Sequence, residues 1–325
     1  MATTIYHDED ADLAVIEGSS VAVVGYGNQG RSWALNLRDS GFDTRVCVRA
    51  DASREQAVSD GFSPLELEDA SESDIVCVLI PDDVIPELPL KRKADGLTIV
   101  ASGYTLAFDR FDPDGDVGMV APRMLGPEVR KCYEEGIGFI TAVGVHHDVT
   151  GKAKERTLAL AKAIGGLKQG AIELTPHQEA VLDLAEEQVR SAVMTHVGQA
   201  YVSALMEMGI PLEAIITEMT LSGESERTMR LIREIGYAGQ FRFHSPTSQY
   251  GQLTRREAFK EFDVAPKMRE MLEYIASGEF ANEWDGERDA GYPNLEALRE
   301  QHAGESTAAF EKDIRSKLGE GSLKR

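Results

Sequence analysis

The sequence predicts an α/β doubly wound sheet followed by an all-α helical domain. Three observations carry this prediction. An apolar strand runs into a glycine-rich turn, short apolar runs alternate with helical stretches as far as residue 175, and only helical patterns follow. Short buried strands that alternate with helices are typical of a parallel, doubly wound sheet with helices on both faces. We therefore expect a sheet domain at residues 1–175 and a helical domain at residues 176–325.

The glycine-rich turn lies in the segment VAVVGYGNQG, residues 21–30. In this motif the first glycine, Gly25, allows a tight turn. The second, Gly27, allows a pyrophosphate to approach the backbone, and the third, Gly30, allows the next helix to pack closely on the strand. That helix would offer free N–H groups and the positive end of its dipole to phosphates. Because a strand precedes the turn and a helix follows it, we predict a dinucleotide-binding Rossmann domain rather than a purely structural turn.

The remaining elements place other residues at the same edge of the sheet. Strands are expected at residues 21–25, 44–48, 75–80, 98–101, 117–121 and 138–145. Ligands of such sheets bind beyond the carboxyl ends of the strands, where Pro81, Asp82, Pro122 and Arg123 fall. Helices of the second domain are expected at residues 176–208, 211–221, 224–235, 255–277 and 294–318.

Composition excludes several classes of protein. The net charge of −21 argues against a nucleic-acid partner, since phosphates would be repelled. No apolar run approaches the length of a membrane span, and the N-terminal segment is acidic and polar, so we expect a cytoplasmic protein without a membrane partner. Cys47, Cys77 and Cys132 have no ligand spacing and are interpreted as reduced packing residues.

The segment VRADASR, residues 48–54, follows the second strand, where a dinucleotide's ribose is recognised. An acidic residue at the strand end favours NAD, whereas arginine accommodates a 2'-phosphate. Arg49 occupies that end, and Ser53 and Arg54 are within reach of a phosphate, so we predict NADP(H). Asp51 argues for NAD, and Arg49 could instead stack under adenine in either cofactor.

Two further groups of residues bear on metal binding. Glu179, Asp183 and Glu187 are spaced i, i+4, i+8, which places three carboxylates on one helix face. Such a face is either solvated or a Mg²⁺ site, and the spacing alone does not choose between them. His146 and His147 have no carboxylate at ligand spacing in the sequence, so we interpret them as loop or core histidines.

Seven segments, in order along nearly the whole chain, resemble ketol-acid reductoisomerase in its short form. They are GYGNQG, LIPDD, MVAPR with GPEVR and YEEG, GKAKERTLALAKAIGG, DLxxEQ at residues 183–188, AGQFRFHSPTSQYG and GEFANEW. The resemblance implies a helical domain that intertwines with that of a second subunit, so that a homodimer shares its active sites. It also implies that two Mg²⁺ ions bind a 2-acetolactate-type substrate, an alkyl group migrates, and NADPH reduces the resulting 2-keto acid.

The resemblance assigns roles by position. Asp183 and Glu187 match the family's first metal-binding pair, and Ser245 matches a serine that contacts the substrate carboxylate. The family's second carboxylate pair, on the partner subunit, falls on Thr220 and Glu224. One ligand is therefore missing, unless a shift of register brings in Glu218 or Glu226. Matched cofactor contacts are Tyr26, Gly27, Asn28, Gln29, Arg49, Asp82 and Gly126.

Two more positions depart from the family. Its active-site histidine falls on Ser102 and its lysine on Arg123, and neither replacement titrates near neutral pH. Alkyl migration depends most on two bridged metals, whereas reduction needs less. Our hypothesis is an NADP(H)-dependent, Mg²⁺-assisted reductase of a small 2-keto acid that lacks isomerisation, with Arg123, Ser245 and Ser102 holding the substrate. Two alternatives stay open: an authentic ketol-acid reductoisomerase of branched-chain amino-acid biosynthesis, and a non-catalytic sensor of NADP(H) or a keto acid.

Overall fold

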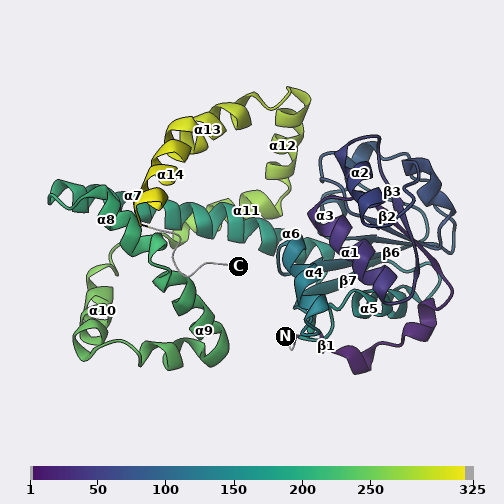
Figure 1. Ribbon diagram of the computed structural model, residues 1–325, viewed down its shortest axis with the longest axis horizontal. Coiled ribbons are helices and arrows are strands. Elements are labelled where there is room, and N and C mark those ends of the chain that lie inside the picture. Colours follow the sequence, from purple (N-terminus) through teal and green to yellow (C-terminus); the bar gives the residue numbers. More distant parts are fainter. Residues whose placement is uncertain (1–2, 319–325) are drawn as a thin grey trace. The chain divides into compact units, whose positions relative to one another are not determined.

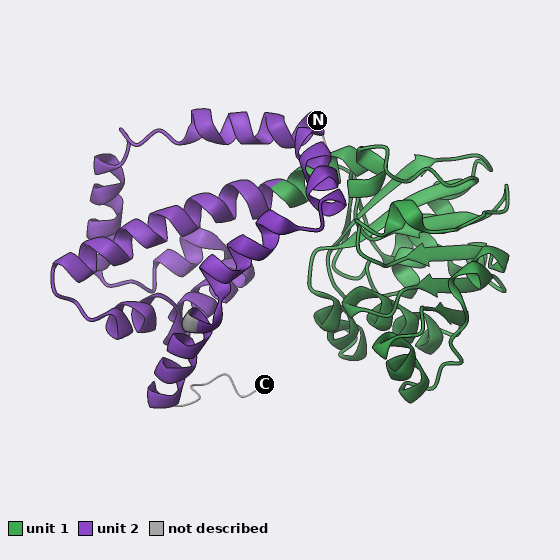
Figure 2. Cartoon of the chain, turned by 90° about the horizontal axis from the view of Figure 1, so that it is seen from above, with its two compact units in different colours: residues 1–184 green, residues 185–325 purple. Residues whose placement is uncertain are grey.

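The computed structural model describes residues 3–318 in two compact units, Met1–Leu184 and Ala185–Arg325, which we call unit 1 and unit 2 (Figure 2). The division lies one helix beyond the predicted boundary between residues 175 and 176. Helix α6 (Pro176–Ala185) belongs to unit 1 because its Glu179 pairs with residues that follow the strands of the sheet.

Unit 1 contains an eight-stranded sheet in the order β1-β8-β7-β6-β5-β4-β2-β3 (Figure 1). The strands are β1 Ile5–Tyr6, β2 Ser20–Val24, β3 Asp43–Cys47, β4 Ile75–Val78, β5 Leu97–Val100, β6 Asp116–Pro122, β7 Thr141–His147 and β8 Ala171–Glu173. All six predicted strands are present, and the predicted fold class is confirmed. The sheet is mixed, however, since β7 is antiparallel to β6 and β1 to β8. β7 runs back because it starts at the edge where β6 ends, with Thr141 opposite Pro122.

The two faces of this sheet pack on different helices, because successive side chains of a strand point to opposite faces. Val21 and Val23 of β2 join the core cluster that contains residues of α1, α2, α4 and α5, whereas Ala22 and Val24 join the cluster on the other face. The helices of unit 1 are α1 Asn28–Asp39, α2 Ala52–Ser59, α3 Tyr104–Ala107, α4 Gly126–Glu134 and α5 Ala153–Ala163, with short 3-10 segments η1 Asp8–Asp10, η2 Leu13–Ile16, η3 Leu67–Glu72 and η4 Ile85–Glu87. The second face is covered by the short elements η3, η4 and α3.

Unit 2 is helical throughout its described residues, as predicted. Its elements are the π-helical turn η5 Glu186–Arg190, α7 Ser191–Glu207, α8 Leu212–Ile216, the π-helical turn η6 Thr217–Leu221, α9 Glu224–Phe241, α10 Pro246–Ala258, α11 Ala265–Ala276, α12 Glu279–Asp289, α13 Pro293–Ala303 and α14 Glu305–Leu318. The sequence analysis missed α12 and the start of α10, where the side chain of Ser245 caps the helix and Pro246 occupies its first turn. The predicted helix at residues 255–277 is interrupted because Asp263 and Pro266 start a new helix, α11.

None of the helices in residues 3–318 is both long and apolar enough to cross a membrane. Cys47, Cys77 and Cys132 are buried and free, as expected for packing residues, and they form no disulfide.

Candidate active site

The three glycines of the turn between β2 and α1 meet different neighbours. Gly25 has a φ of 96°, and a Cβ there would stand 2.6 Å from the Leu79 carbonyl oxygen. A Cβ at Gly30 would stand 2.2 Å from the carbonyl oxygen of Gly25, whereas nothing lies within 4 Å of a Cβ at Gly27. The first and third glycines therefore allow close packing of the chain. Gly27 leaves open space at the N-terminus of α1, where a phosphate would bind.

A second helix N-terminus lies beside this turn. A Cβ at Gly126, the first residue of α4, would stand 2.3 Å from the carbonyl oxygen of Asn28 in α1. Ser32 donates a hydrogen bond to the Gly126 carbonyl at 2.7 Å, and Gln29 donates one to the Met124 carbonyl at 3.2 Å. Two helix N-termini therefore meet at one edge of the sheet, and both dipoles favour an anion there.

A groove of about 430 Å³ opens at this edge of the sheet. Its lining residues are Gly25, Tyr26, Gly27, Val48, Arg49, Asp51, Ser53, Leu67, Leu79, Ile80, Pro81, Val84, Glu87, Leu88 and Pro89. The groove thus joins the glycine turn to the end of β3, the two places that hold the pyrophosphate and the adenosine ribose in Rossmann domains. The turn leaves open space for the phosphates of a dinucleotide at Gly27, where a Cβ would meet no atom within 4 Å.

The polar residues after β3 have different roles in the fold. Arg49 and Ser53 line the groove, and the Asp51 carboxylate accepts a hydrogen bond of 2.9 Å from the Ser53 N–H, capping α2. Arg54 is absent from the lining. Its guanidinium donates to the Val48 carbonyl at 3.2 Å and lies 2.8 Å from the Glu66 carboxylate. Of these two arginines, only Arg49 therefore lines the groove.

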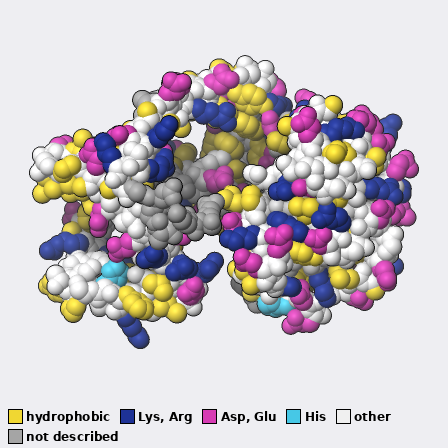
Figure 3. Space-filling model, in the orientation of Figure 1, with side chains coloured by type: hydrophobic (Ala, Val, Ile, Leu, Met, Phe, Trp, Pro, Cys, Tyr) yellow, Lys and Arg dark blue, Asp and Glu magenta, His cyan; other side chains and the backbone are white. Residues whose placement is uncertain are grey.

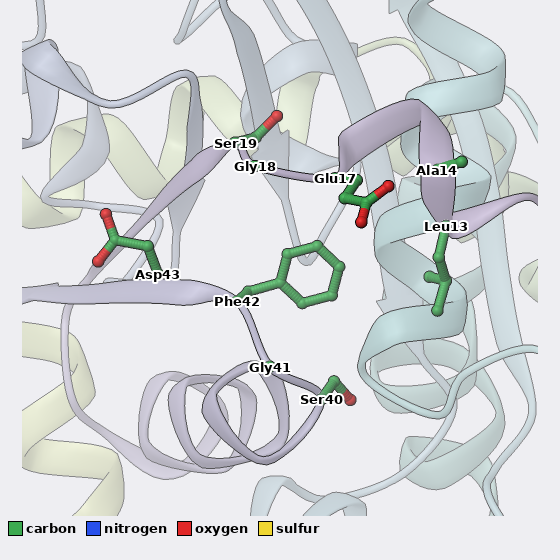
Figure 4. A pocket seen from close by; sticks show the side chains of 9 residues that line it. All are labelled: Leu13, Ala14, Glu17, Gly18, Ser19, Ser40, Gly41, Phe42 and Asp43. Atoms are coloured by element: carbon green, nitrogen blue, oxygen red, sulfur yellow. The ribbon is translucent and has the colours of Figure 1, made fainter.

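A larger cavity, of about 520 Å³, lies elsewhere (Figure 4). Its lining residues are Leu13, Ala14, Glu17, Gly18, Ser19, Ser40, Gly41, Phe42 and Asp43. Ser19 precedes β2 and Asp43 begins β3, so this cavity is at the amino ends of the strands. The Glu17 carboxylate lies among the lining side chains and no lysine or arginine lines the cavity, which makes it unsuited to a phosphate-bearing ligand.

Beyond the end of β6, Arg123 meets two carboxylates of α6. Its Nη2 contacts Oε1 of Glu179 and lies 3.4 Å from Oδ1 of Asp183. Glu179 is fully buried, and its Oε2 accepts a hydrogen bond of 2.6 Å from the Gly103 N–H. A Cβ at Gly103 would stand 2.2 Å from the carbonyl oxygen of Pro176, so only glycine allows α3 and α6 to approach this closely.

Carboxylates outnumber cations in this group. Burial, followed by the charges of Glu179, Asp83 and Asp183, raises the pKa of Asp82 to about 6. Burial also raises the pKa of Glu179, although the Gly103 N–H and Arg123 oppose that shift. Arg123 has a further buried donor, Nε, for which no partner exists within residues 3–318. The site is therefore net negative and places an unused N–H of Arg123 beside the carboxylates.

The acidic stripe predicted on one helix face does not have a uniform environment. Glu179 is buried, Asp183 is partly buried, and Glu187 is exposed within the π-helical turn η5, which interrupts the regular i, i+4 spacing. π-helical turns inside α-helices are frequent at functional sites. Ser102 also lies at this edge of unit 1, where its Oγ accepts a hydrogen bond of 3.2 Å from the Tyr104 N–H at the start of α3.

The other predicted residues belong to unit 2. Thr220 lies in the π-helical turn η6, and its hydroxyl donates to a main-chain carbonyl one turn earlier, at 3.0 Å. Glu224 begins α9 and lines a pocket of about 390 Å³ together with Arg227 and His244. Ser245 follows His244 and caps α10, accepting a hydrogen bond of 3.3 Å from the Ser248 N–H. Unit 2 thus brings Glu224 close to the start of the Ser245 helix.

Sequence reasoning found no role for Glu179 beyond membership of the stripe. The missing signal was its pairing with Arg123, 56 residues earlier in the chain, and no local spacing rule connects two such residues. A buried acid at this position requires a cation and an N–H donor nearby, and both come from loops at the carboxyl ends of strands.

A Rossmann sheet, a dinucleotide groove and an adjoining carboxylate-rich site, followed by a helical unit, define a two-unit dinucleotide-dependent enzyme. Comparison with known families then specifies which kind. Residues 15–170 match the family model described as acetohydroxy acid isomeroreductase, NADPH-binding domain, and residues 177–320 match the one described as ketol-acid reductoisomerase, C-terminal domain. The chain therefore belongs to the ketol-acid reductoisomerase family and is an oxidoreductase of that type.

Individual relatives agree with this assignment. The ketol-acid reductoisomerase (NADP(+)) of Sulfurisphaera tokodaii is 39% identical over 301 residues, which cover 90% of each chain. The enzyme of the same name from Methanocaldococcus jannaschii is 37% identical and covers 97% of this chain and 98% of its own. A solved NADH-preferring ketol-acid reductoisomerase from an uncultured archean has a TM-score of 0.88 at 34% identity, over 98% of this chain and 99% of its own.

Proposed function

We propose that this enzyme reduces a small 2-keto acid with NADPH at the carboxyl edge of unit 1, assisted by Mg²⁺, and that it has lost the isomerisation step. The observation that carries the proposal is the excess of carboxylates at that edge, next to a dinucleotide groove. Asp82 follows Pro81, which lines the groove, and the charges of Glu179 and Asp183 contribute to the raised pKa of Asp82. The groove and the carboxylates are therefore adjacent.

The groove supports NADPH as the cofactor. Arg49 lines it at the end of β3, where a guanidinium can pair with a 2'-phosphate, and Ser53 can donate a further hydrogen bond. Relatives carry names with NADP(+), with NAD(P)(+) in Metallosphaera sedula, and with a preference for NADH in the solved structure. We infer NADPH for this chain from Arg49. Replacing Arg49 with alanine should weaken NADPH binding at least tenfold and NADH binding much less.

The charge of the site supports a divalent cation. A 2-keto acid is an anion, and it would be repelled by Asp82, Glu179 and Asp183, which Arg123 offsets only in part. Asp183 and Glu187 offer hard oxygen ligands of the kind that Mg²⁺ takes. When bound, Mg²⁺ supplies a Lewis acid for the substrate carbonyl, and NADPH supplies the hydride.

Within the site, Arg123 acts mainly as a fixed cation. Its ion pair with buried Glu179 holds the guanidinium in place, and the part of the side chain that stays exposed can meet a substrate oxygen. Arginine stays protonated at every relevant pH, so Arg123 orients the substrate and does not exchange protons. Ser102 and Ser245 supply neutral hydroxyls for the substrate carboxylate.

The proposed loss of isomerisation depends on the second metal pair. The Thr220 hydroxyl cannot replace a carboxylate and already donates within its own helix, which leaves Glu224 alone. Alkyl migration develops charge on adjacent oxygens and needs two metals, whereas hydride transfer to a ketone needs one polarising cation. A pure sensor of NADP(H) would have no use for a carboxylate-rich site, so we favour an enzyme.

We further propose a homodimer in which the partner contributes Glu224 and Ser245. Helix α7 buries none of its residues in a single copy, and Met194, Val197, Tyr201 and Met206 are 47–60% exposed. Figure 3 shows hydrophobic side chains on the surface of this unit at several places. Large apolar side chains that are exposed along a helix in this way are typical of an interface with another copy or partner. Sedimentation at several concentrations should give a dimer, and a stable monomer would contradict it.

The test of the chemistry is NADPH oxidation with three substrate classes, with Mg²⁺ or with EDTA: 2-acetolactate, 3-hydroxy-3-methyl-2-oxobutanoate, and simple 2-oxo acids. We expect Mg²⁺-dependent turnover of 3-hydroxy-3-methyl-2-oxobutanoate and no turnover of 2-acetolactate. Thr220→Glu should restore turnover of 2-acetolactate, whereas the control Ser225→Glu, which adds the same charge nearby, should not. Ordinary turnover of 2-acetolactate by the unmodified enzyme would instead identify an authentic reductoisomerase. No turnover of any substrate would favour a sensor.

A further inference from the structure

Two histidines and a carboxylate meet in unit 1, away from the carboxyl edge. His146 and His147 end β7, and Asp112 lies in the segment between α3 and β6. One ligand atom from each of the three residues lies within 4.8 Å of the others, and Nδ1 of His147 is 3.6 Å from Oδ1 of Asp112. The two imidazole rings have centroids 4.3 Å apart. The sequence analysis found no carboxylate for these histidines, and the structure provides one.

An irregularity in the sheet brings the two rings together. Successive residues of a regular strand point to opposite faces, so adjacent histidines would normally diverge. Here Val117 of β6 is opposite His147 whereas Gly118 is opposite Val145, which leaves His146 as the extra residue of a β-bulge. Bulges redirect side chains and are over-represented near functional sites.

The segments that carry the three residues are anchored on one buried group. Asp116, which begins β6 four residues after Asp112, is fully buried. Its carboxylate accepts hydrogen bonds from the Val149 N–H at 2.9 Å and from the Thr150 N–H and hydroxyl at 3.0 and 2.6 Å, and it pairs with Arg156 at 3.0 Å. The backbone on both sides is therefore held in place before any ligand arrives.

We propose that Asp112, His146 and His147 form a binding site for a divalent transition metal of the Zn²⁺ class. Two imidazoles and one carboxylate are a usual donor set for Zn²⁺ with water in the remaining position, whereas Mg²⁺ and Ca²⁺ prefer oxygen ligands. Asp112 is exposed and His147 partly exposed, so small side-chain rotations suffice to bring the ligand atoms to bonding distance.

This site is separate from the reduction chemistry. His147 is opposite Val117 at the start of β6, whereas Arg123 follows the end of that strand, about 20 Å away at the usual rise per residue. A metal here joins the end of β7 to the segment before β6. Its effect is on the stability of unit 1, and the inference does not depend on the proposed function.

The experiment uses the untagged full chain, stripped with EDTA and then supplied with excess Mg²⁺ to occupy hard-cation sites. Zn²⁺ is titrated by calorimetry, and Co²⁺ is followed by its visible absorption. We expect one Zn²⁺ per chain in Mg²⁺ and a higher midpoint of thermal unfolding. His147→Ala and His146→Ala should each lower the affinity at least about tenfold. The control His302→Ala, at an exposed position on α13, should not.

Three outcomes would overturn the proposal. One is unchanged Zn²⁺ affinity in the variant that lacks both histidines. Another is loss of the high-affinity site in Asp183→Asn, which would place the metal at the carboxyl edge. The third is binding of several Zn²⁺ ions with the same weak affinity in every variant. Should the histidine variants fail to fold, Asp112→Asn changes only an exposed side chain, and unchanged affinity and Co²⁺ absorption in that variant would overturn the proposal equally.

Discussion

Asp82 should destabilise the folded protein at neutral pH, so replacing it with asparagine should be stabilising. Its pKa is raised from 3.8 to about 6 because of burial and three neighbouring carboxylates, of which Glu179 is the strongest. No hydrogen bond within residues 3–318 reaches its carboxylate to compensate. Each tenfold change in proton affinity corresponds to about 1.4 kcal/mol, so the charged form costs about 3 kcal/mol in the folded state.

The sign of this effect sets its pH dependence. Between pH 4 and 6 folded Asp82 keeps a proton that the unfolded chain has released, so its contribution makes the free energy of unfolding fall as the pH rises through this window. Below that window Asp82 is neutral in both states and costs little. Asp82→Asn should therefore gain up to about 3 kcal/mol at pH 7 and progressively less towards pH 5.

Urea unfolding of the EDTA-treated protein, without cofactor, measures this difference at pH 5, 6, 7 and 8. Asp95→Asn is the matched control, because it removes the same charge from an exposed position of unit 1. A stabilisation by Asp82→Asn that is the same at every pH, or any destabilisation at pH 8, would refute the argument. Mg²⁺ should reduce the gain, since a cation near Asp183 favours the charged carboxylate.

Three further predictions concern the fold and the cofactor site. Arg123→Met leaves the buried Glu179 carboxylate without its cation, and urea unfolding should show a loss of about 3–5 kcal/mol, with a smaller loss for Arg123→Lys because the charge remains. Gly27→Ala should keep the thermal midpoint but weaken NADPH binding measured by fluorescence at least tenfold, whereas Gly30→Ala should lower the midpoint, since its Cβ would collide with the preceding turn. Trp33→Ala removes a fully buried side chain from α1, so the free energy of unfolding in urea should fall by about 3–5 kcal/mol. A fall of less than about 1 kcal/mol would contradict the position of Trp33 in the core.

Much of the fold was predictable because the relevant signals are local. The run VAVV and the glycines behind it lie within ten residues, and their roles follow from turn geometry that any surrounding fold preserves. The antiparallel direction of β7 was harder to predict, because an apolar run shows that a strand forms but not which way it runs in the sheet. Likewise, α10 and α12 contain glycine and polar residues that weaken a helical pattern. The start of α10 is favoured locally, by the Ser245 cap and by Pro246 in the first turn.

The candidate site was predictable only in part. Asp183, Arg123, Asp82 and the glycine turn were singled out from the sequence, and the structure places them at one edge of unit 1. Their assigned roles remain proposals. The sequence could not indicate that Arg54 would be used on main-chain carbonyls, because that depends on where the loop after α2 passes.

By itself, the sequence determined the class of fold, the position of the dinucleotide turn and the departures from the family at Ser102, Arg123 and Thr220. Only the tertiary structure decided which charges meet. Three features depend on residues that are far apart in the chain. They are the ion pair of Arg123 with Glu179, the effect of Glu179 and Asp183 on the pKa of Asp82, and the approach of Asp112 to His147. Electrostatic interactions and burial depend on distances in space. Because the strands of the sheet are ordered differently from the chain, these distances cannot be predicted from sequence separation alone.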